Sequence, residues 1–164
     1  MIERAASKHL LVIWHSRTGA SKAMARAAHD AAPNSRLLRA DEVTGEDLLA
    51  ACAYLFVCPE NLGTMSGLMK EMFDRTYYDV LGQIEGRSFA SIIAAGSDGA
   101  GAQRQLERIV TGWRLKRVAE PVIVNFDAQS PEEIAKPKIV PDKVLKDCHD
   151  LGLGLAEGVA MGLF

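Results

Sequence analysis

Three short apolar runs without a charged residue constrain the fold of this chain more than any other feature. They are Leu10–Trp14, Ala53–Cys58 and Phe89–Ala95. Each run is too short for a packed helix and is rich in branched or aromatic residues, which is typical of a strand buried on both faces. Strands of this kind occur in parallel sheets that helices cover on both sides.

Turn residues and helical periodicity alternate with these runs along the chain. After the first run, alanines recur on one helical face between residues 20 and 31, and a weaker strand is expected at Arg36–Arg39. A last strand is expected at Val118–Phe126, where Pro121 lacks a ladder donor and therefore favours an edge position. Five strands that alternate with helices predict an α/β three-layer sandwich, with a parallel sheet in the order 2-1-3-4-5.

Length, charge and cysteine content narrow the class of protein. The 164 residues predict one domain, residues 1–164. With 19 Lys and Arg against 21 Asp and Glu, the net charge of −2 gives no electrostatic reason to expect nucleic acid or an anionic membrane as a partner. Three scattered cysteines predict neither a disulfide framework nor a metal site. No apolar run reaches the length of a membrane span or a signal peptide core, so we expect a cytoplasmic protein.

The most unusual loops of the chain follow three of the expected strands. They are Ser16–Ser21, Pro59–Gly67 and Gly96–Gly101. In an open parallel sheet of this order, ligands bind beyond the carboxyl ends of the strands, at the switch point between strands 1 and 3. The sequence therefore predicts a ligand site that these three loops form together.

The first of these loops has the chemistry of an anion site. Hydroxyls at Ser16, Thr18 and Ser21 accompany Gly19 at a junction between a strand and a helix. The free N–H groups and partial positive charge of a helix start suit a terminal phosphate. The loop lacks both the Gly-Lys-Ser/Thr of nucleoside-triphosphate sites and the Gly-x-Gly-x-x-Gly of dinucleotide turns. The same hydroxyls also fit ordinary helix caps, and the loop alone does not decide between the two interpretations.

All three loops resemble those of flavodoxin-like FMN proteins. Ser16–Ser21 is similar to the family's phosphate loop, whose usual form is Ser/Thr-x-Thr-Gly-x-Thr. The stretch from Pro59 to Lys70 resembles the second flavin loop of NAD(P)H-dependent FMN and quinone reductases, and Gly96–Gly101 resembles their third loop. The likeness extends from residue 10 to residue 124 and implies a flavodoxin-like fold that binds FMN. The chain departs from the pattern in its third loop, which lacks the tyrosine that covers the ring in electron-carrier flavodoxins.

The resemblance also implies which residues hold the cofactor. Main-chain N–H groups near residues 61–63 would address N5 and O4 of the flavin, and those of residues 97–99 the N1 and O2 edge. No catalytic side chain and no metal ligand is implied, because hydride passes directly between nicotinamide and flavin. The expected FMN contacts are Ser16, Arg17, Thr18, Gly19, Ala20 and Ser21 for the phosphate, and Pro59, Glu60, Asn61, Leu62, Gly63, Thr64, Met65, Ser97, Asp98 and Gly99 for the ring.

Two functions fit such a protein. One is an NAD(P)H-dependent oxidoreductase that reduces quinones, flavin or a similar small-molecule electron acceptor through FMN, with NAD(P)H as co-substrate. The other is a flavodoxin-type electron carrier without its own NAD(P)H site. Carriers of that family tend to be strongly acidic, so a net charge of −2 favours the enzyme.

The likeness to flavin reductases further implies a possible homodimer. Candidates for the contact between chains are Met65, Met69, Met72, Tyr77 and Tyr78, although methionines at helical spacing are more often core residues.

Two other classes of protein with a similar sheet are excluded because this chain lacks residues that they require. A response regulator needs acidic residues where this chain has His15-Ser16 and Cys58-Pro59. A small tyrosine phosphatase needs a Cys-x5-Arg loop, and neither Cys52 nor Cys58 is followed by arginine at that spacing.

Overall fold

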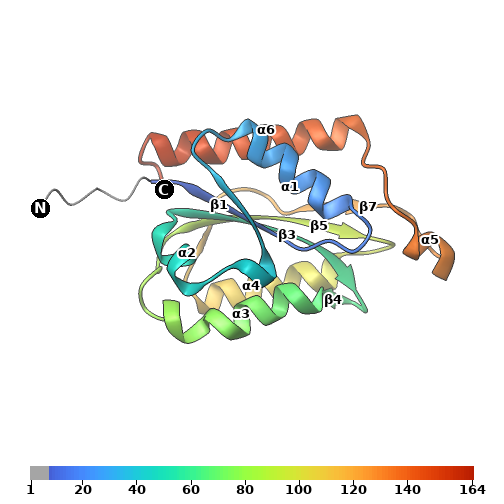
Figure 1. The fold of residues 1–164 in the computed structure, drawn as a ribbon, viewed down its shortest axis with the longest axis horizontal. Helices are drawn as coiled ribbons and strands as arrows, with labels where there is room; N and C mark the ends of the chain where they lie inside the picture. The colour runs from blue at the N-terminus through green and yellow to red at the C-terminus, as the bar shows by residue number, and fades with distance from the viewer. Residues whose placement is uncertain (1–7) are drawn as a thin grey trace, which may run out of the picture.

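The computed structural model describes residues 8–164 as a sheet between two layers of helices (Figure 1). The first seven residues of the expected domain 1–164 lie outside the described residues. In chain order the elements are β1 (Leu10–Trp14), α1 (Ala20–Ala31), β2 (Arg36–Arg39), a 3-10 turn η1 (Ala40–Glu42), α2 (Gly45–Ala50), β3 (Ala53–Asn61), β4 (Thr64–Met65), α3 (Gly67–Val80), β5 (Ser88–Ala95), α4 (Ala100–Gly112), β6 (Lys116–Arg117), β7 (Val122–Asn125), α5 (Pro131–Ala135) and α6 (Asp142–Ala160).

The sheet confirms the predicted class and strand order. Its parallel strands run β2-β1-β3-β5, and β6 and β7 both pair in parallel with the outer side of β5. With β6 and β7 counted as one broken strand, this is the order 2-1-3-4-5. The sheet has seven strands rather than five, because the last strand is split and a short strand, β4, pairs antiparallel with the end of β3.

Proline explains the split in the last strand. Lys116 and Arg117 pair with the start of β5, and the chain rejoins the sheet only at Val122, opposite Ile92. Pro121 stands immediately before the second piece and has no N–H to donate to a ladder. The predicted edge position of the last strand is confirmed, but the expected bounds Val118–Phe126 are too wide, and Pro121 lies just outside β7.

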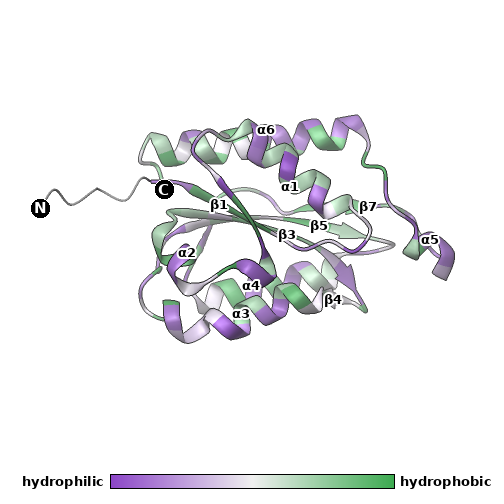
Figure 2. Cartoon of the chain, viewed as in Figure 1, coloured by the Kyte–Doolittle hydropathy of each residue, from purple (hydrophilic) through white to green (hydrophobic). Residues whose placement is uncertain are grey.

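Alternating side chains of the buried strands supply two separate cores. Leu11 and Ile13 face a core shared with α2, α3 and α4, whereas Leu10 and Val12 face a core shared with α1 and α6. The central strands are accordingly apolar along most of their length, and the polar residues lie mainly on the outer helix surfaces (Figure 2). The three methionines that we considered for a contact between chains, Met65, Met69 and Met72, lie in the first core instead.

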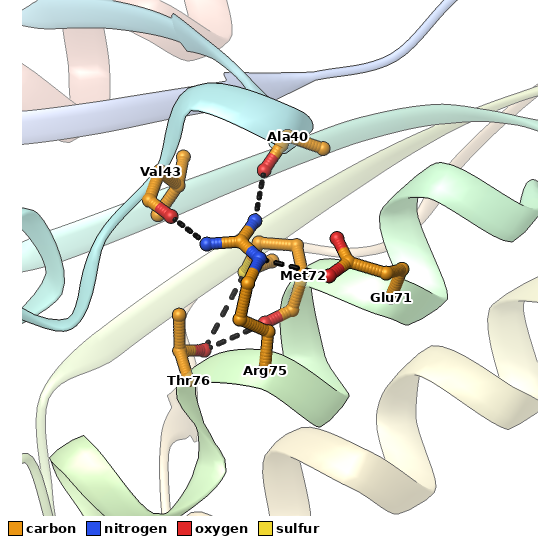
Figure 3. Close-up of polar contacts among 6 residues, drawn as sticks. All are labelled: Ala40, Val43, Glu71, Met72, Arg75 and Thr76. Carbon is orange, nitrogen blue, oxygen red and sulfur yellow. Dashed lines mark hydrogen bonds and ion pairs between the residues drawn. The ribbon is translucent and has the colours of Figure 1, made fainter.

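Arg75 of α3 binds the segment that connects β2 to α2 (Figure 3). Its guanidinium donates to the carbonyl oxygens of Ala40 and Val43 and pairs with Glu71 at 2.8 Å. Thr44 caps the helix α2 that follows, because its Oγ1 accepts from the N–H of Asp47 at 3.2 Å. These contacts hold the segment after β2 against α3.

The cysteines are buried or half-buried thiols without a disulfide. Burial raises the pKa of Cys58 to about 12 and that of Cys148 to about 11, because a thiolate is poorly solvated there. Within residues 8–164, no three His, Cys, Asp or Glu side chains gather closely enough to hold a metal ion. In the same part of the chain, no helix combines the length and apolarity that crossing a bilayer requires.

Glycine allows α6 to pack closely against α1. A Cβ atom at Gly152 would overlap the backbone of Ala28, whereas one at Gly154 would meet nothing within 4 Å. The small face of α1 and the glycine of α6 therefore let two helix backbones approach each other, which offsets the poor helix propensity of glycine.

We expect Gly152→Ala and Gly154→Ala to change stability in opposite directions. The first substitution forces α1 and α6 apart and should lower the free energy of unfolding by about 1–3 kcal/mol. The second adds helix propensity without a clash and should raise it by about 1 kcal/mol. Urea denaturation of both variants measures the difference, and equal effects would contradict the close approach.

Candidate functional site

The three predicted loops meet at one edge of the sheet. Ser16–Gly19 follows β1, Glu60–Thr64 closes the end of β3, and Gly96–Gly99 follows β5. Because β1, β3 and β5 are neighbouring parallel strands, their carboxyl ends lie side by side (Figure 1). The structure therefore brings the expected residues together from three segments of the chain.

The helix after β1 starts without a side-chain cap. Gly19 adopts a left-handed conformation with φ of 93°, and its N–H donates to Ser16 Oγ at 3.0 Å. Within residues 8–164, no side chain accepts from the first N–H groups of α1 that follow. A Cβ at Gly19 would meet nothing within 4 Å, so the space in front of the helix is open. A twelve-residue helix thus presents free donors and its positive end to this space.

Ser21, the second residue of α1, adds a buried hydroxyl to this helix start. The residue is only 1% exposed, and its hydroxyl has no hydrogen-bond partner within residues 8–164. A buried hydroxyl without a partner costs about 1–3 kcal/mol, so such groups are rare unless something else satisfies them. The orphan hydroxyl and the uncapped helix start together fit an oxygen-rich anion.

Two contacts fix the first loop from its flanks. His15 Nδ1 and Ser66 Oγ are 2.8 Å apart, which links the end of β1 to the residue that precedes α3. Burial, together with the nearby charges of Arg39 and Arg17, lowers the pKa of His15, so this imidazole is mostly neutral at pH 7. On the other flank, the N–H of Lys138 donates to the carbonyl of Thr18 at 2.8 Å.

The second loop is a hairpin rather than the open loop that the sequence predicts. Strand β3 continues past Pro59 to Asn61, turns through Leu62 and Gly63, and pairs with β4. Both turn residues have positive φ, 54° for Leu62 and 76° for Gly63. This is the geometry of a tight hairpin turn, in which glycine is relaxed but leucine is strained. The side chain of Leu62 is also fully exposed, so this apolar side chain forms the tip.

Glu60 ties the hairpin to the third loop. Its carboxylate accepts from the N–H of Gly99 at 2.9 Å and from that of Ala102 at 3.0 Å. It thereby caps the N-terminus of α4 from a different segment of the chain, where a negative charge is favourable. A Cβ at Gly101 would overlap the carbonyl of Gly63, so the hairpin tip lies directly against the first turn of α4.

Not every expected donor is available to a ligand. The N–H of Gly99 is bonded to Glu60, and that of Met65 donates to Gln105 Oε1 at 2.8 Å. The Met65 side chain is buried in the core. The N–H groups of Ser97 and Asp98, in contrast, have no acceptor among residues 8–164.

A fourth segment at this edge was not predicted from the sequence. The Asn125 side chain donates to the Ser97 carbonyl at 2.8 Å, and the Ala128 N–H donates to the Gly96 carbonyl at 2.8 Å. The residues after β7 therefore support the third loop from outside. Their only sequence signal is an asparagine at the end of a strand, which is too common to single out.

Comparison with known proteins agrees with this geometry. The family model for NADPH-dependent FMN reductases matches residues 40–129, more than half of the chain. A protein named flavodoxin, from Aquifex aeolicus (strain VF5), is 31% identical over 163 residues, which covers 93% of this chain and 87% of that protein. The chain belongs to the flavodoxin-like FMN proteins. The resemblance and the fold predicted from sequence are both confirmed.

Several solved structures share the fold of this FMN protein at low sequence identity. A flavodoxin from the domain Archaea has a TM-score of 0.76 at 20% identity and covers 93% of this chain and 99% of that one. A flavodoxin, WrbA-like protein from Agrobacterium tumefaciens has a TM-score of 0.71 at 16% identity, with coverage of 94% and 99%. The flavodiiron protein from Giardia intestinalis has a TM-score of 0.73 at 17% identity and covers 93% of this chain but 36% of that one.

The cofactor of the family fits the site of this FMN protein. A phosphate monoester needs many donors, and the uncapped start of α1 with the partnerless Ser21 hydroxyl offers them. Beside it, the hairpin and the third loop lie close enough to be joined by Glu60. An anion seat next to two joined loops suits a phosphate connected to a flat ring.

We expect Glu60→Gln to loosen the junction of the two ring loops. An amide has one acceptor oxygen, so one of the two bonds to the start of α4 is lost, with a cost of about 1–2 kcal/mol in unfolding free energy. Hydrogen exchange at Gly99 or Ala102 should become faster. Glu120→Gln is the matched control, because it removes the same charge from an exposed position. Unchanged exchange at both amides would contradict the role of Glu60.

Proposed function

We propose that this FMN protein is an NAD(P)H-dependent oxidoreductase that reduces quinones, flavin or similar small acceptors. The observation that carries the proposal is the absence of aromatic cover at the ring loops. Neither residues 59–65 nor residues 96–101 include a Phe, Tyr or Trp. A ring between these loops keeps a face open to a second planar molecule, as direct hydride transfer requires.

Trp14 does not supply the missing cover. Its ring, at the end of β1, lies beside the cations of Lys22 and Arg39, whose charged groups are 5.7 Å and 5.8 Å from its centroid. Trp14 also packs against the core shared with α1 and α6. These contacts engage the indole with α1 and with the end of β2.

The phosphate end of FMN is assigned to the first loop in this proposal. The N–H groups at the start of α1 and the hydroxyls of Thr18 and Ser21 donate to the phosphate oxygens, and Arg17 adds an exposed positive charge. Burial and the nearby arginines lower the pKa of His15, which reduces the positive charge that it contributes near neutral pH. This end of the site anchors the cofactor and takes no part in the chemistry.

The ring end of the site orients the reaction. FMN supplies the acceptance and delivery of hydride when bound. In this proposal the main-chain groups of residues 61–63 would fix its N5 side, and the N–H groups of Ser97 and Asp98 would fix its O2 side. The latter donors favour negative charge on the reduced ring, whereas the Glu60 carboxylate beside them opposes it. The strained, exposed Leu62 gives the ring an apolar edge to lie on.

An electron carrier is the second candidate function. The relative from Aquifex aeolicus that carries the name flavodoxin favours it. A carrier needs neither an open ring face nor a coenzyme site, and it exchanges single electrons with protein partners. The match to the NADPH-dependent FMN reductase family supports the enzyme instead.

Rapid anaerobic mixing of the FMN-loaded protein with NADH or NADPH distinguishes the two functions. The enzyme should lose its flavin absorbance within seconds and regain it when a quinone is added. A carrier should keep its colour with both coenzymes, yet pass electrons to ferricytochrome c after its flavin has been reduced with dithionite. Persistent colour with both coenzymes would overturn the proposed activity.

We expect Ser21→Ala to weaken FMN binding without harming the apoprotein. Removal of a partnerless buried hydroxyl leaves the stability of the apoprotein unchanged or slightly higher, whereas a lost phosphate bond costs about 1–3 kcal/mol of FMN affinity. Fluorescence titration with FMN and thermal melts of the apoprotein measure the two effects. Ser88→Ala, at the opposite end of β5, is the control and should bind FMN normally. Equal FMN affinity of wild type and Ser21→Ala would place the phosphate elsewhere.

A further inference from the structure

A continuous open groove runs between α3 and α4, away from the flavin loops. Its first part, of about 570 Å³, begins at Gly63 and Gly101, where the hairpin meets α4. Its second part, of about 440 Å³, extends to Gly112 and Trp113. Lys70, Arg108 and Ile109 line both parts, so the two form one groove. Each part falls within the usual range of about 300–1,000 Å³ for small-molecule sites.

Unpaired positive charge lines the groove beside the hairpin. Arg104 and Arg108 stand one turn apart on α4, and both are exposed. Within residues 8–164, no carboxylate forms an ion pair with either guanidinium. Lys70 adds a third cation from α3, paired with Asp74 at 2.6 Å. Two free guanidiniums in one groove are a site for phosphate groups.

Aromatic side chains line the far part of the same groove. Tyr77 and Tyr78 of α3 both contribute to it, with ring centroids 5.0 Å apart and planes at 80°. Tyr77 and Tyr78 are 39% and 83% exposed, so both rings are accessible to a ligand in the groove. An exposed tyrosine offers a stacking surface to a nucleobase.

We propose that this groove binds the phosphates and the adenine of NAD(P)H, with Arg104 and Arg108 on the phosphates and the tyrosines on the base. The inference rests on the proposed function, since it assigns a place to the co-substrate of that reaction. The order of the groups matches an extended dinucleotide: open ring loops at Gly63, then cations, then aromatic rings. From Gly101 to Gly112 the α4 axis rises about 16 Å at ~1.5 Å per residue, a span suited to such a molecule.

Charge favours a dinucleotide over a second copy of this chain. A two-fold contact centred on Arg104 and Arg108 would bring the arginines of both copies toward one another, and such like-charge contacts are unfavourable. A small anionic ligand with an aromatic end satisfies the cations and the tyrosines together.

Calorimetric titration of the FMN-loaded protein with ADP and with 2′,5′-ADP tests the site without any turnover. Wild type should bind at least one of the two. The double variant Arg104→Gln, Arg108→Gln should bind about tenfold or more weakly, as expected for the loss of charge-assisted bonds. Tyr78→Ala should weaken binding of either nucleotide about fivefold or more through lost stacking. The control, Arg26→Gln with Lys143→Gln, makes the same change in net charge on α1 and α6.

Stopped-flow reduction by NADH and NADPH separates this inference from the proposed function. Weakening of both coenzymes in the double arginine variant assigns the arginines to the shared pyrophosphate, and weakening of NADPH alone assigns them to the 2′-phosphate. Suppose that nucleotide binding depends on the arginines but neither coenzyme reduces the flavin of the wild type. This result would support the nucleotide site and overturn the proposed activity. If the flavin of the double arginine variant is reduced with unchanged coenzyme affinity, the proposed nucleotide site is overturned. A wild type that binds neither nucleotide would also overturn the proposed nucleotide site. The same holds if sedimentation shows a dimer and the groove binds no nucleotide.

Discussion

An uncapped helix start with a buried, partnerless hydroxyl is the constraint around which this molecule is organised. Within residues 8–164, the first N–H groups of α1 lack a side-chain acceptor, and the buried Ser21 hydroxyl has no partner, which carries a desolvation cost. Parallel strands place this start beside the ends of β3 and β5, so a ligand held here by its phosphate extends over the neighbouring loops. The fold and the anion seat are therefore parts of one arrangement.

Glu60 gives the ring end of the site its shape. The carboxylate joins the hairpin to the start of α4, so a shift of one ring loop moves the other. Glu60 also accepts from the Gly99 N–H, which we expected from the sequence to bind the flavin. Ser97 and Asp98 are then the residues of the third loop whose N–H groups are free within residues 8–164. A negative charge in this position makes the site less favourable to an anionic reduced ring than a bare helix start would be.

Periodicity and turn chemistry predicted most of the fold and the meeting of the three loops. The three apolar runs became β1, β3 and β5, and the three loops that follow them meet at one edge. The β3–β4 hairpin could not be read from the sequence, because Leu62 is a poor residue for a left-handed turn and Pro59 looks like the end of a strand. Contacts such as those of Glu60 and Asn125 join residues about 30–40 positions apart. No local pattern encodes such pairs, so only the folded chain reveals them.

The broken last strand has a consequence for how the molecule behaves among its own copies. A long unpaired strand at the rim of a sheet is a template onto which another chain can add by backbone hydrogen bonding. Here the rim beyond β5 consists of a two-residue and a four-residue piece, separated by a proline. The opposite rim, β2, is four residues long and begins and ends with arginine. Both margins thus resist intermolecular strand addition, which protects an exceptionally apolar sheet from fibrous aggregation.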